Sequence, residues 1–185
     1  AAVAPTYPTP PETATAGLTL VESLVITVED EFGNPRIGDV VTWTVGPNSG
    51  SVSQTETTVA SDGTAQVDWT LGQAVGINTL TVAVGGTAFS EVLSVTGEAG
   101  APVQPTGTPV ASQSGTVATA LSTALTVTVV DQFGNPVSGE TVSWSTTDAG
   151  ASFSPASAAT DAAGQVSTSW TLGTVSGPQA ATATM

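Results

Sequence analysis

Acidic residues are the side chains in this sequence whose types and spacing come nearest to a metal site. Glu29, Asp30 and Glu31 are consecutive, and Asp39 follows a short distance along the chain. Grouped carboxylates suit Ca²⁺, which prefers oxygen ligands, so these four residues are candidate calcium ligands. The run lacks the alternating D-x-D-x-D-G form of a dedicated calcium loop. The competing interpretation is that Asp30 accepts hydrogen bonds within a turn and that its neighbours are solvated.

Pairs of carboxylates are also what glycoside hydrolysis requires. Asp30 with Asp39, or Asp62 with Asp68, are the candidate pairs, but the loops that carry them are too short to form a cleft. The sequence contains no His, Cys or Lys, so it lacks the usual neutral-pH proton shuttle, a thiolate nucleophile and a Schiff-base amine. We therefore expect no catalytic residues, no enzyme activity and, apart from calcium, no cofactor.

The charge balance excludes one large class of partner. The formal net charge is −14, with 15 acidic residues against a single basic residue, Arg36. Nucleic acid is not expected as a partner, because phosphate binding depends on Lys and Arg. No apolar stretch approaches the ~18 residues of a membrane-spanning helix, so no membrane span is expected. The scarcity of Lys and Arg leaves trypsin-like proteases little to cut, which suits an extracellular protein.

The chain contains one internal repeat. Residues 30–43 read DEFGNPRIGDVVTW, and residues 131–144 read DQFGNPVSGETVSW at an offset of 101. The same offset carries the Trp-Thr-Leu-Gly of residues 69–72 onto residues 170–173. We therefore predict two copies of one unit of about 100 residues, with domain 1 at residues 1–100 and domain 2 at residues 101–185.

Within each copy the apolar residues alternate with polar ones at the period of a β-strand. Leu24, Ile26 and Val28 fall on one face of such a strand, and no segment has helical apolar spacing. The pattern predicts an all-β chain of two tandem immunoglobulin-like Greek-key sandwiches. Its strands in the first copy are expected near residues 1–9 with 14–21, 24–30, 39–45, 51–59, 63–71, 78–84 and 88–97. The predicted structural core is Trp43, Trp69, Trp144 and Trp170.

Between strands, the repeated D-x-F-G-N-P segment has the chemistry of a turn. Gly and Asn tolerate positive φ, Pro fixes the exit of the chain, and the leading Asp can accept hydrogen bonds from the turn N–H groups. The predicted turn residues are Asp30, Gly33, Asn34 and Pro35 in the first copy and Asp131, Gly134, Asn135 and Pro136 in the second.

The order of a β-run, D-x-F-G-N-P-V-x-G-x-x-V-x-W and a late W-T-L-G resembles the bacterial immunoglobulin-like domains of the invasin and intimin type, across both copies. In that family the domains stack end to end as rod-like stalks of large surface proteins, which implies a similar role at a bacterial cell surface. Arg36 departs from the pattern, since Val137 occupies its place in the second copy. Nothing resembles the lectin-like tip that carries receptor binding, so no receptor is implied.

The second copy stops where the first continues. Met185 aligns with Val84, and residues 85–100, which include an apolar alternation that predicts a last strand, have no counterpart. The second sandwich therefore lacks its last strand within this chain, which would expose an apolar groove and an unpaired edge. One interpretation is a cut through a longer repeat array. The other is donor-strand exchange, in which Val3 and Tyr7 of an identical neighbouring subunit fill the groove and build a head-to-tail filament.

Three functions are thus expected in order. The first is an extracellular structural stalk or fibre of a bacterial surface adhesin, with neighbouring repeats as partners and a Pro-containing joint near residues 98–109 that limits bending. The second is the filament subunit. The third is a carbohydrate- or ice-binding surface of outward Thr residues such as Thr126 and Thr128, although outward Thr is also what strands favour.

Overall fold

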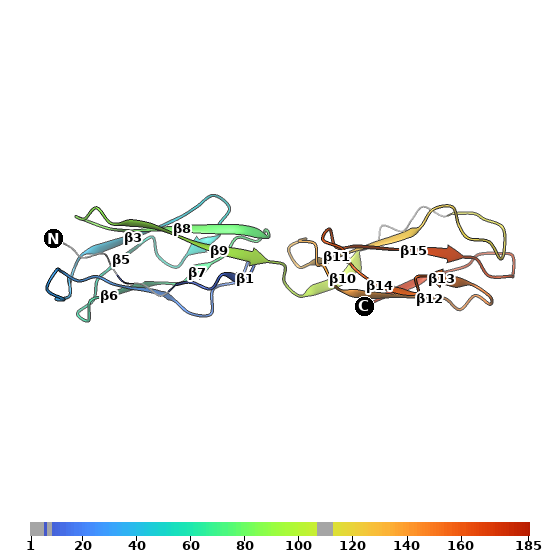
Figure 1. The fold of residues 1–185 in the computed structure, drawn as a ribbon, viewed down its shortest axis with the longest axis horizontal. Helices are drawn as coiled ribbons and strands as arrows, with labels where there is room; N and C mark the ends of the chain where they lie inside the picture. Colours follow the sequence, from blue (N-terminus) through green and yellow to red (C-terminus); the bar gives the residue numbers. More distant parts are fainter. Residues whose placement is uncertain (1–5, 7–8, 107–112) are drawn as a thin grey trace. The chain divides into compact units, whose positions relative to one another are not determined.

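A computed structural model describes residue 6, residues 9–106 and residues 113–185. Within this part of the chain there are strands and loops but no helix, which confirms the predicted all-β fold (Figure 1). It follows that no helix in the described residues is long and apolar enough to cross a membrane. The chain divides into two compact units, unit 1 (Ala1–Glu98) and unit 2 (Ala99–Met185).

Unit 1 is built from two layers of strands. The first layer is a five-stranded sheet in the order β1-β9-β8-β3-β5, and the facing layer consists of the two-stranded sheets β2-β6 and β4-β7. The strands are β1 (Thr13–Thr15), β2 (Leu24–Thr27), β3 (Val40–Val45), β4 (Ser51–Val52), β5 (Glu56–Thr58), β6 (Thr64–Val67), β7 (Trp69–Thr70), β8 (Gly76–Val84) and β9 (Ser90–Glu98).

Unit 2 repeats this architecture with fewer strands. A four-stranded sheet in the order β10-β11-β15-β13 faces a three-stranded sheet in the order β14-β12-β16. The strands are β10 (Pro102–Thr106), β11 (Leu125–Asp131), β12 (Thr141–Ser145), β13 (Ser152–Ser154), β14 (Ser157–Ala159), β15 (Gln165–Thr171) and β16 (Thr182–Thr184).

The core of each unit follows from the period-two pattern of its strands. In β2 the side chains of Leu24 and Ile26 are buried, whereas Val25 and Thr27, which alternate with them, are only half-buried. Alternate residues point to opposite faces of a strand, so a strand with this pattern covers a core on one side only. The core of unit 1 holds sixteen buried apolar residues, with Trp43 and Trp69 the largest of those that are almost fully buried.

Two predicted strands of unit 1 are each divided in the structure. Residues 51–59 were predicted as one strand, but β4 pairs with β7 while β5 pairs with β3, so the segment changes layers. The predicted strand 63–71 is interrupted at Asp68 between β6 and β7. Ser53 and Asp68 account for the breaks, since the Ser53 N–H donates to the Asp68 carbonyl (2.9 Å) and the Asp68 N–H donates to the Ser53 Oγ (3.1 Å).

The predicted joint at residues 98–109 is shorter in the structure. β9 extends to Glu98, and β10 begins at Pro102 and pairs antiparallel with β11. Residues 102–106 are therefore an entry strand of unit 2, and residues 99–101 at the start of that unit link β9 to β10; residues 107–112 lie outside the described part of the chain.

Candidate functional site

The D-x-F-G-N-P loop of unit 1 is organised around the carboxylate of Asp30. Its Oδ1 accepts hydrogen bonds from the backbone N–H groups of Phe32 and Asn34, each at 2.9 Å. The Asn34 side-chain amide donates to both carboxylate oxygens, at 3.2 and 3.0 Å. These hydrogen bonds hold the pKa of Asp30 below its ordinary value. The bond from the Asn34 side chain has the largest effect, followed by the bond from the Asn34 backbone N–H.

The corresponding loop of unit 2 has one additional contact. Asp131 Oδ1 accepts from the N–H groups of Phe133 (2.8 Å) and Asn135 (2.9 Å). Its Oδ2 accepts from the Asn135 side chain (2.8 Å) and also from the backbone N–H of Gly100 (2.9 Å). Burial raises the pKa of Asp131, but the hydrogen bonds from Asn135, Gly100 and Phe133 outweigh it, so the pKa lies below its ordinary value.

Both loops use their glycine and proline as turn residues. Gly33 and Gly134 have φ values of 82° and 84°, in the left-handed region that favours glycine. Pro136 then bridges back to Val130, and the backbone there lies close to Gly164. A Cβ on Gly164 would meet the Val129 carbonyl oxygen at 2.4 Å, so a larger residue there would displace the loop.

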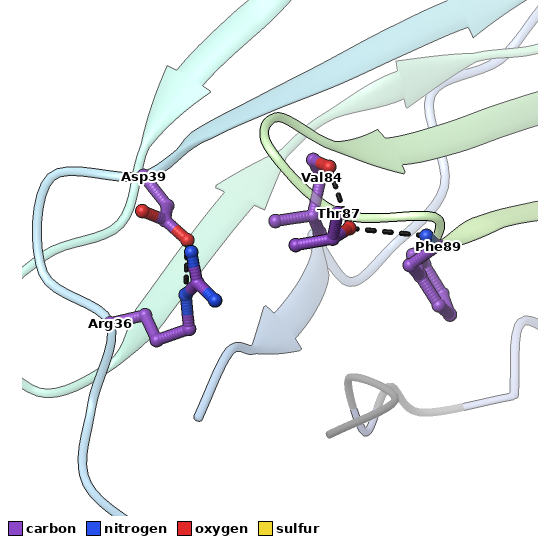
Figure 2. Close-up of polar contacts among 5 residues, drawn as sticks. All are labelled: Arg36, Asp39, Val84, Thr87 and Phe89. Atoms are coloured by element: carbon purple, nitrogen blue, oxygen red, sulfur yellow. Dashed lines mark hydrogen bonds and ion pairs between the residues drawn. The ribbon is translucent and has the colours of Figure 1, made fainter. Parts of the chain in front are cut away.

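The structure does not assemble the predicted calcium site of Glu29, Asp30, Glu31 and Asp39. Across the described residues, no group of three or more acidic side chains is placed to hold a metal ion. Asp30 is held by its own loop, and Asp39 accepts a hydrogen bond from the Arg36 Nε in an ion pair (Figure 2). The four carboxylates do not come together in this geometry, and calcium binding stays a prediction.

The two carboxylates of the other candidate pair also have local partners. Asp62 accepts hydrogen bonds from the backbone N–H (3.0 Å) and the hydroxyl (2.8 Å) of Thr64. Both bonds lower the pKa of Asp62, and the bond from the hydroxyl has the larger effect. The Asp68 carboxylate accepts a hydrogen bond from the Ser23 hydroxyl. Both aspartates therefore stabilise turns or strand junctions in this geometry, which does not resemble an acid and base facing one substrate.

The tryptophans of unit 1 are fully integrated into its core. Trp43 and Trp69 are 1% and 0% exposed. The Trp43 Nε1 donates to the Thr57 hydroxyl at 2.8 Å, and the Trp69 Nε1 donates to the Ser49 carbonyl at 2.9 Å. A buried indole N–H without a partner costs about 1–3 kcal/mol, so these two acceptors matter for stability.

The tryptophans of unit 2 are less well accommodated. Trp170 is buried and Trp144 is half-buried, and both pack against the ring of Phe153, at centroid distances of 5.9 and 6.3 Å. In the described residues neither Nε1 atom has a hydrogen-bond partner, although both atoms are inaccessible to solvent. The offset of 101 explains why Trp144 lacks an acceptor, since Ala158 occupies the position that Thr57 has in unit 1, where Thr57 accepts from Trp43.

Two polar positions were not identified from the sequence. Ser49 is buried, and its hydroxyl accepts from the Thr79 N–H at 2.9 Å. Asn78 is also buried, and its Oδ1 accepts from the Gly72 N–H at 2.8 Å. Gln179 does the same for Gly173 in unit 2, at 2.6 Å. The sequence contains a signal for the last two positions, because the offset of 101 aligns Asn78 with Gln179 and both have amide side chains.

The hairpin between β8 and β9 brings the last strand of unit 1 back along the sheet. The Thr87 hydroxyl donates to the Val84 carbonyl at 2.7 Å and accepts from the Phe89 N–H at 3.1 Å (Figure 2). β9 then pairs antiparallel with β8 and parallel with β1, so it lies between two strands.

The remaining predicted site residues are not brought into a site. Thr126 is exposed and Thr128 half-buried on β11, next to Ser167 and Gln165 of β15. A carbohydrate- or ice-binding role for them stays a prediction. The proposed donor residues Val3 and Tyr7 lie outside the described residues.

Comparison with known proteins identifies the second copy. Residues 106–185 match the family model of the bacterial Ig-like domain, group 1, which confirms the resemblance drawn from the sequence motifs. No curated protein matches the chain by sequence.

Solved structures support the fold. The Escherichia coli adhesin FdeC is 19% identical, with a TM-score of 0.55 over 94% of this chain and 56% of that structure. The D0-D1 domain of intimin is 18% identical, with a TM-score of 0.41 over 98% and 90% of the two chains. Invasin, described as a bacterial integrin-binding protein, is 20% identical, with a TM-score of 0.46 over 98% and 36%. At this identity the likeness to FdeC shows a shared immunoglobulin-like fold, and this chain spans about half of that structure.

Proposed function

Because residues 106–185 match the family model of the bacterial Ig-like domain, group 1, we propose that the chain is a structural segment of a bacterial surface protein. In this role each unit is a spacer that sets distance and resists force, without enzyme activity. The internal repeat supports the proposal, since tandem copies of one sandwich are what a stalk requires. The fold shared with the adhesin FdeC supports an extracellular location at a bacterial surface.

The observation that carries the proposal is the set of contacts made by the short segment after β9. This segment consists of residues 99–101, the first of which, Ala99, packs against the core of unit 2. The next residue, Gly100, donates its N–H to the buried carboxylate of Asp131. A spacer needs a connection with little freedom in order to transmit distance, and we propose that this short segment provides it.

The polar chemistry of the described residues fits the same role. Hydrogen bonds within turns or at strand junctions engage the carboxylates of Asp30, Asp62, Asp68 and Asp131. Carboxylates used in this way stabilise the loops between strands and are not free to serve as acid, base or ligand. The partners we propose are neighbouring repeats, and no receptor follows from the similarity.

Distance measurements between the two units test the proposal. The chain has no Cys, so Ser61→Cys with Thr147→Cys, both at exposed positions, would carry one spin label on each unit. Pulsed electron paramagnetic resonance should give one narrow distance distribution, and a broad distribution typical of a flexible linker would contradict the spacer role.

A matched pair of variants tests whether the Asp131 contact is the cause of the expected narrow distance distribution. Asp131→Asn places either an NH2 group or an uncharged oxygen opposite the Gly100 N–H, so the hydrogen bond is lost or weakened. This variant should broaden the distance distribution. Asp30→Asn makes the same change in the loop of unit 1, which holds no residue of the connection, and should leave the distribution unchanged. Equal broadening by both variants would show that the Asp131 contact does not control the connection.

A further inference from the structure

We propose that unit 1 carries a binding site for a basic, extended peptide, at the edge of the sandwich between β1 and residues 18–22. The peptide would insert large apolar side chains into the cavity at this edge and place Lys or Arg side chains beside the carboxylates around it. A spacer needs no ligand, so this inference goes beyond the proposed function.

A cavity of about 590 Å³ lies at this edge of unit 1. Its lining includes β1, which belongs to the five-stranded sheet, and residues 18–22. The latter follow the facing layer, since the Leu20 N–H donates to the Trp69 carbonyl at 2.9 Å. Leu20 is 8% exposed and belongs to the core. The cavity therefore opens between the two layers onto a core residue, and its volume falls in the range of ligand sites, about 300–1,000 Å³.

Two aliphatic side chains in the cavity lining are largely exposed to solvent. Leu18 is 49% exposed and Val21 102% exposed. At the offset of 101, unit 2 has Thr119 and Ser122 at these positions, and both are exposed. The sandwich forms there with hydroxyl side chains, so the fold does not require Leu18 and Val21. Exposed aliphatic residues that gather at a cavity are typical of a binding surface.

The edge of β1 provides backbone groups for a peptide strand. β1 lies at the end of its sheet, and among the described strands it pairs with β9 alone. The carbonyl of Glu12, just before β1, accepts from the Thr96 N–H of β9 at 2.9 Å. Backbone groups of successive residues in a strand point to opposite edges, so those of Thr13 face the open side. This geometry selects an extended peptide, which can add to the edge as a further strand.

Three acidic side chains adjoin the cavity and define the charge of its occupant. Glu22 lines the cavity, Glu12 precedes β1, and Glu98 pairs with the last residue of β1. All three residues are exposed. Arg36, the single basic residue of the chain, is engaged in its own ion pair in the loop before β3. Lys or Arg side chains of a peptide would therefore complement this acidic rim.

The second copy lacks the acidic rim at the corresponding place. The counterparts of Glu12 and Glu22, at the offset of 101, are the uncharged residues Gln113 and Thr123. Unit 1 thus differs from unit 2 here in two respects, because it has aliphatic residues in place of hydroxyls and carboxylates in place of neutral side chains. A ligand that is both apolar and basic accounts for both differences, whereas a neutral apolar ligand accounts only for the first.

Binding of a designed peptide to the full chain tests the proposal. The probe is a fluorescently labelled peptide of sequence KTVKLKVTK, which alternates like a strand and carries four lysines. One control replaces its three aliphatic residues with Thr, which keeps the strand preference, and another replaces its lysines with Glu. Fluorescence anisotropy at physiological salt should show saturable 1:1 binding of the probe and at least tenfold weaker binding of each control. No binding of the probe at millimolar concentration, or an equal affinity for either control, would overturn the proposal.

Variants taken from the second copy locate the binding. Leu18→Thr combined with Val21→Ser gives unit 1 the residues of unit 2 and should weaken binding of the probe at least tenfold. Ile37→Ser replaces another aliphatic residue, 62% exposed and outside the cavity lining, with its counterpart Ser138 and should bind the probe as the unaltered chain does. Thermal melts would verify that both variants fold. Equal affinity of the two variants for the probe would overturn the proposal.

A second pair of variants separates the acidic rim from the overall charge of the chain. Glu22→Gln and Glu56→Gln each remove one negative charge from an exposed position of unit 1, but only Glu22 lines the cavity. Glu22→Gln should weaken binding of the probe severalfold, and Glu56→Gln should leave it nearly unchanged. Equal effects would show that the peptide responds to net charge alone, which would overturn the proposal.

Hydrogen exchange of the bound chain identifies the paired strand. The five-stranded sheet has two edges, β1 and β5, so β5 is the internal control. The probe should slow exchange at β1 and leave β5 unchanged. Slower exchange at β5 with no change at β1 would place the peptide at the other edge and overturn the proposal.

Discussion

Unit 1 and unit 2 place tryptophans at corresponding points of two sandwiches, but among the described residues only unit 1 provides partners for its two indole N–H groups. Thr57 accepts from Trp43, whereas the corresponding Ala158 offers Trp144 no acceptor. The fold therefore survives the loss of a core hydrogen bond. What the two copies share is the alternation of the strands and the turns between them, which is enough to specify the sandwich.

The apolar volume of the cores differs in the same direction. Val59 and Val67 are buried in unit 1, and their counterparts Thr160 and Thr168 are buried in unit 2. The threonines satisfy their hydroxyls internally, since Thr160 donates to the Val137 carbonyl and Thr168 to the Pro155 carbonyl, both at 2.7 Å. Unit 2 thus exchanges apolar contact for buried hydrogen bonds, which contribute less to stability than close apolar packing.

The aspartate loops differ in the opposite direction. Asp131 is 2% exposed and accepts from Gly100, whereas Asp30 is half-buried and its described contacts lie within its own loop. The loop of unit 2 therefore does more than close a turn, because it also accepts the N–H of Gly100 at the start of this unit.

Replacing the central tryptophan should have the largest effect. Trp43→Ala removes a fully buried indole and should destabilise unit 1 by about 3–5 kcal/mol. Trp144→Ala should cost unit 2 less, because Trp144 is half-buried and no described residue is a hydrogen-bond partner of its Nε1. Urea unfolding followed at both units would compare the two, and an equal or larger loss for Trp144→Ala would remove the contrast between the cores.

Removing the acceptor at Thr57 and adding one at Ala158 should produce intermediate effects of opposite sign. Thr57→Val keeps the shape of the side chain but leaves the Trp43 Nε1 without an acceptor, so it should destabilise unit 1 by about 1–3 kcal/mol. Ala158→Thr supplies the missing acceptor to Trp144 and should stabilise unit 2 by about 0.5–1.5 kcal/mol. Thermal melts of the two single variants and of the double variant measure these effects. Destabilisation by Ala158→Thr would show that the Trp144 indole is not oriented toward position 158.

Acid should weaken unit 2 through Asp131. Its pKa in the folded chain lies below the ordinary value of 3.8. The carboxylate therefore contributes its full stability above pH 3.8, and this contribution is lost as the pH falls through the folded pKa. Unfolding midpoints measured from pH 6 to pH 2.5 should fall for unit 2, and Asp131→Asn should flatten that part of the dependence. An identical acid dependence in Asp131→Asn would assign the effect to other carboxylates.

Removing the ion pair of unit 1 should have the smallest effect. Arg36 and Asp39 have side chains 29% and 23% exposed, and partly exposed pairs of this kind contribute about 0–1 kcal/mol. Arg36→Val introduces the residue that the second copy has at Val137 and should change the stability of unit 1 by less than about 1 kcal/mol. Chemical denaturation at low and high salt would measure it; a larger loss that salt abolishes would mean that the pair is a major support of the loop.

The sequence predicts the features that depend on local pattern. The all-β fold and the turn at Gly33 follow from residues adjacent in the chain, and the repeat follows from comparing two such segments. The division of residues 51–59 depends on hydrogen bonds between Ser53 and Asp68, and the hold on Gly100 depends on Asp131, so neither is visible in a local window. The local partners of the candidate calcium ligands were missed for a related reason, because the amide of Asn34 and the guanidinium of Arg36 had not been considered beside the carboxylates.

Stretching single molecules of the full chain between its ends tests the spacer role most directly. Two sandwiches that resist force should give two separate unfolding events, each releasing up to about 3.5 Å per residue. The event of unit 2, with its smaller apolar core, should come at the lower force. Smooth extension at low force without separate events would contradict the account, because a segment that yields in this way could not maintain a distance under load.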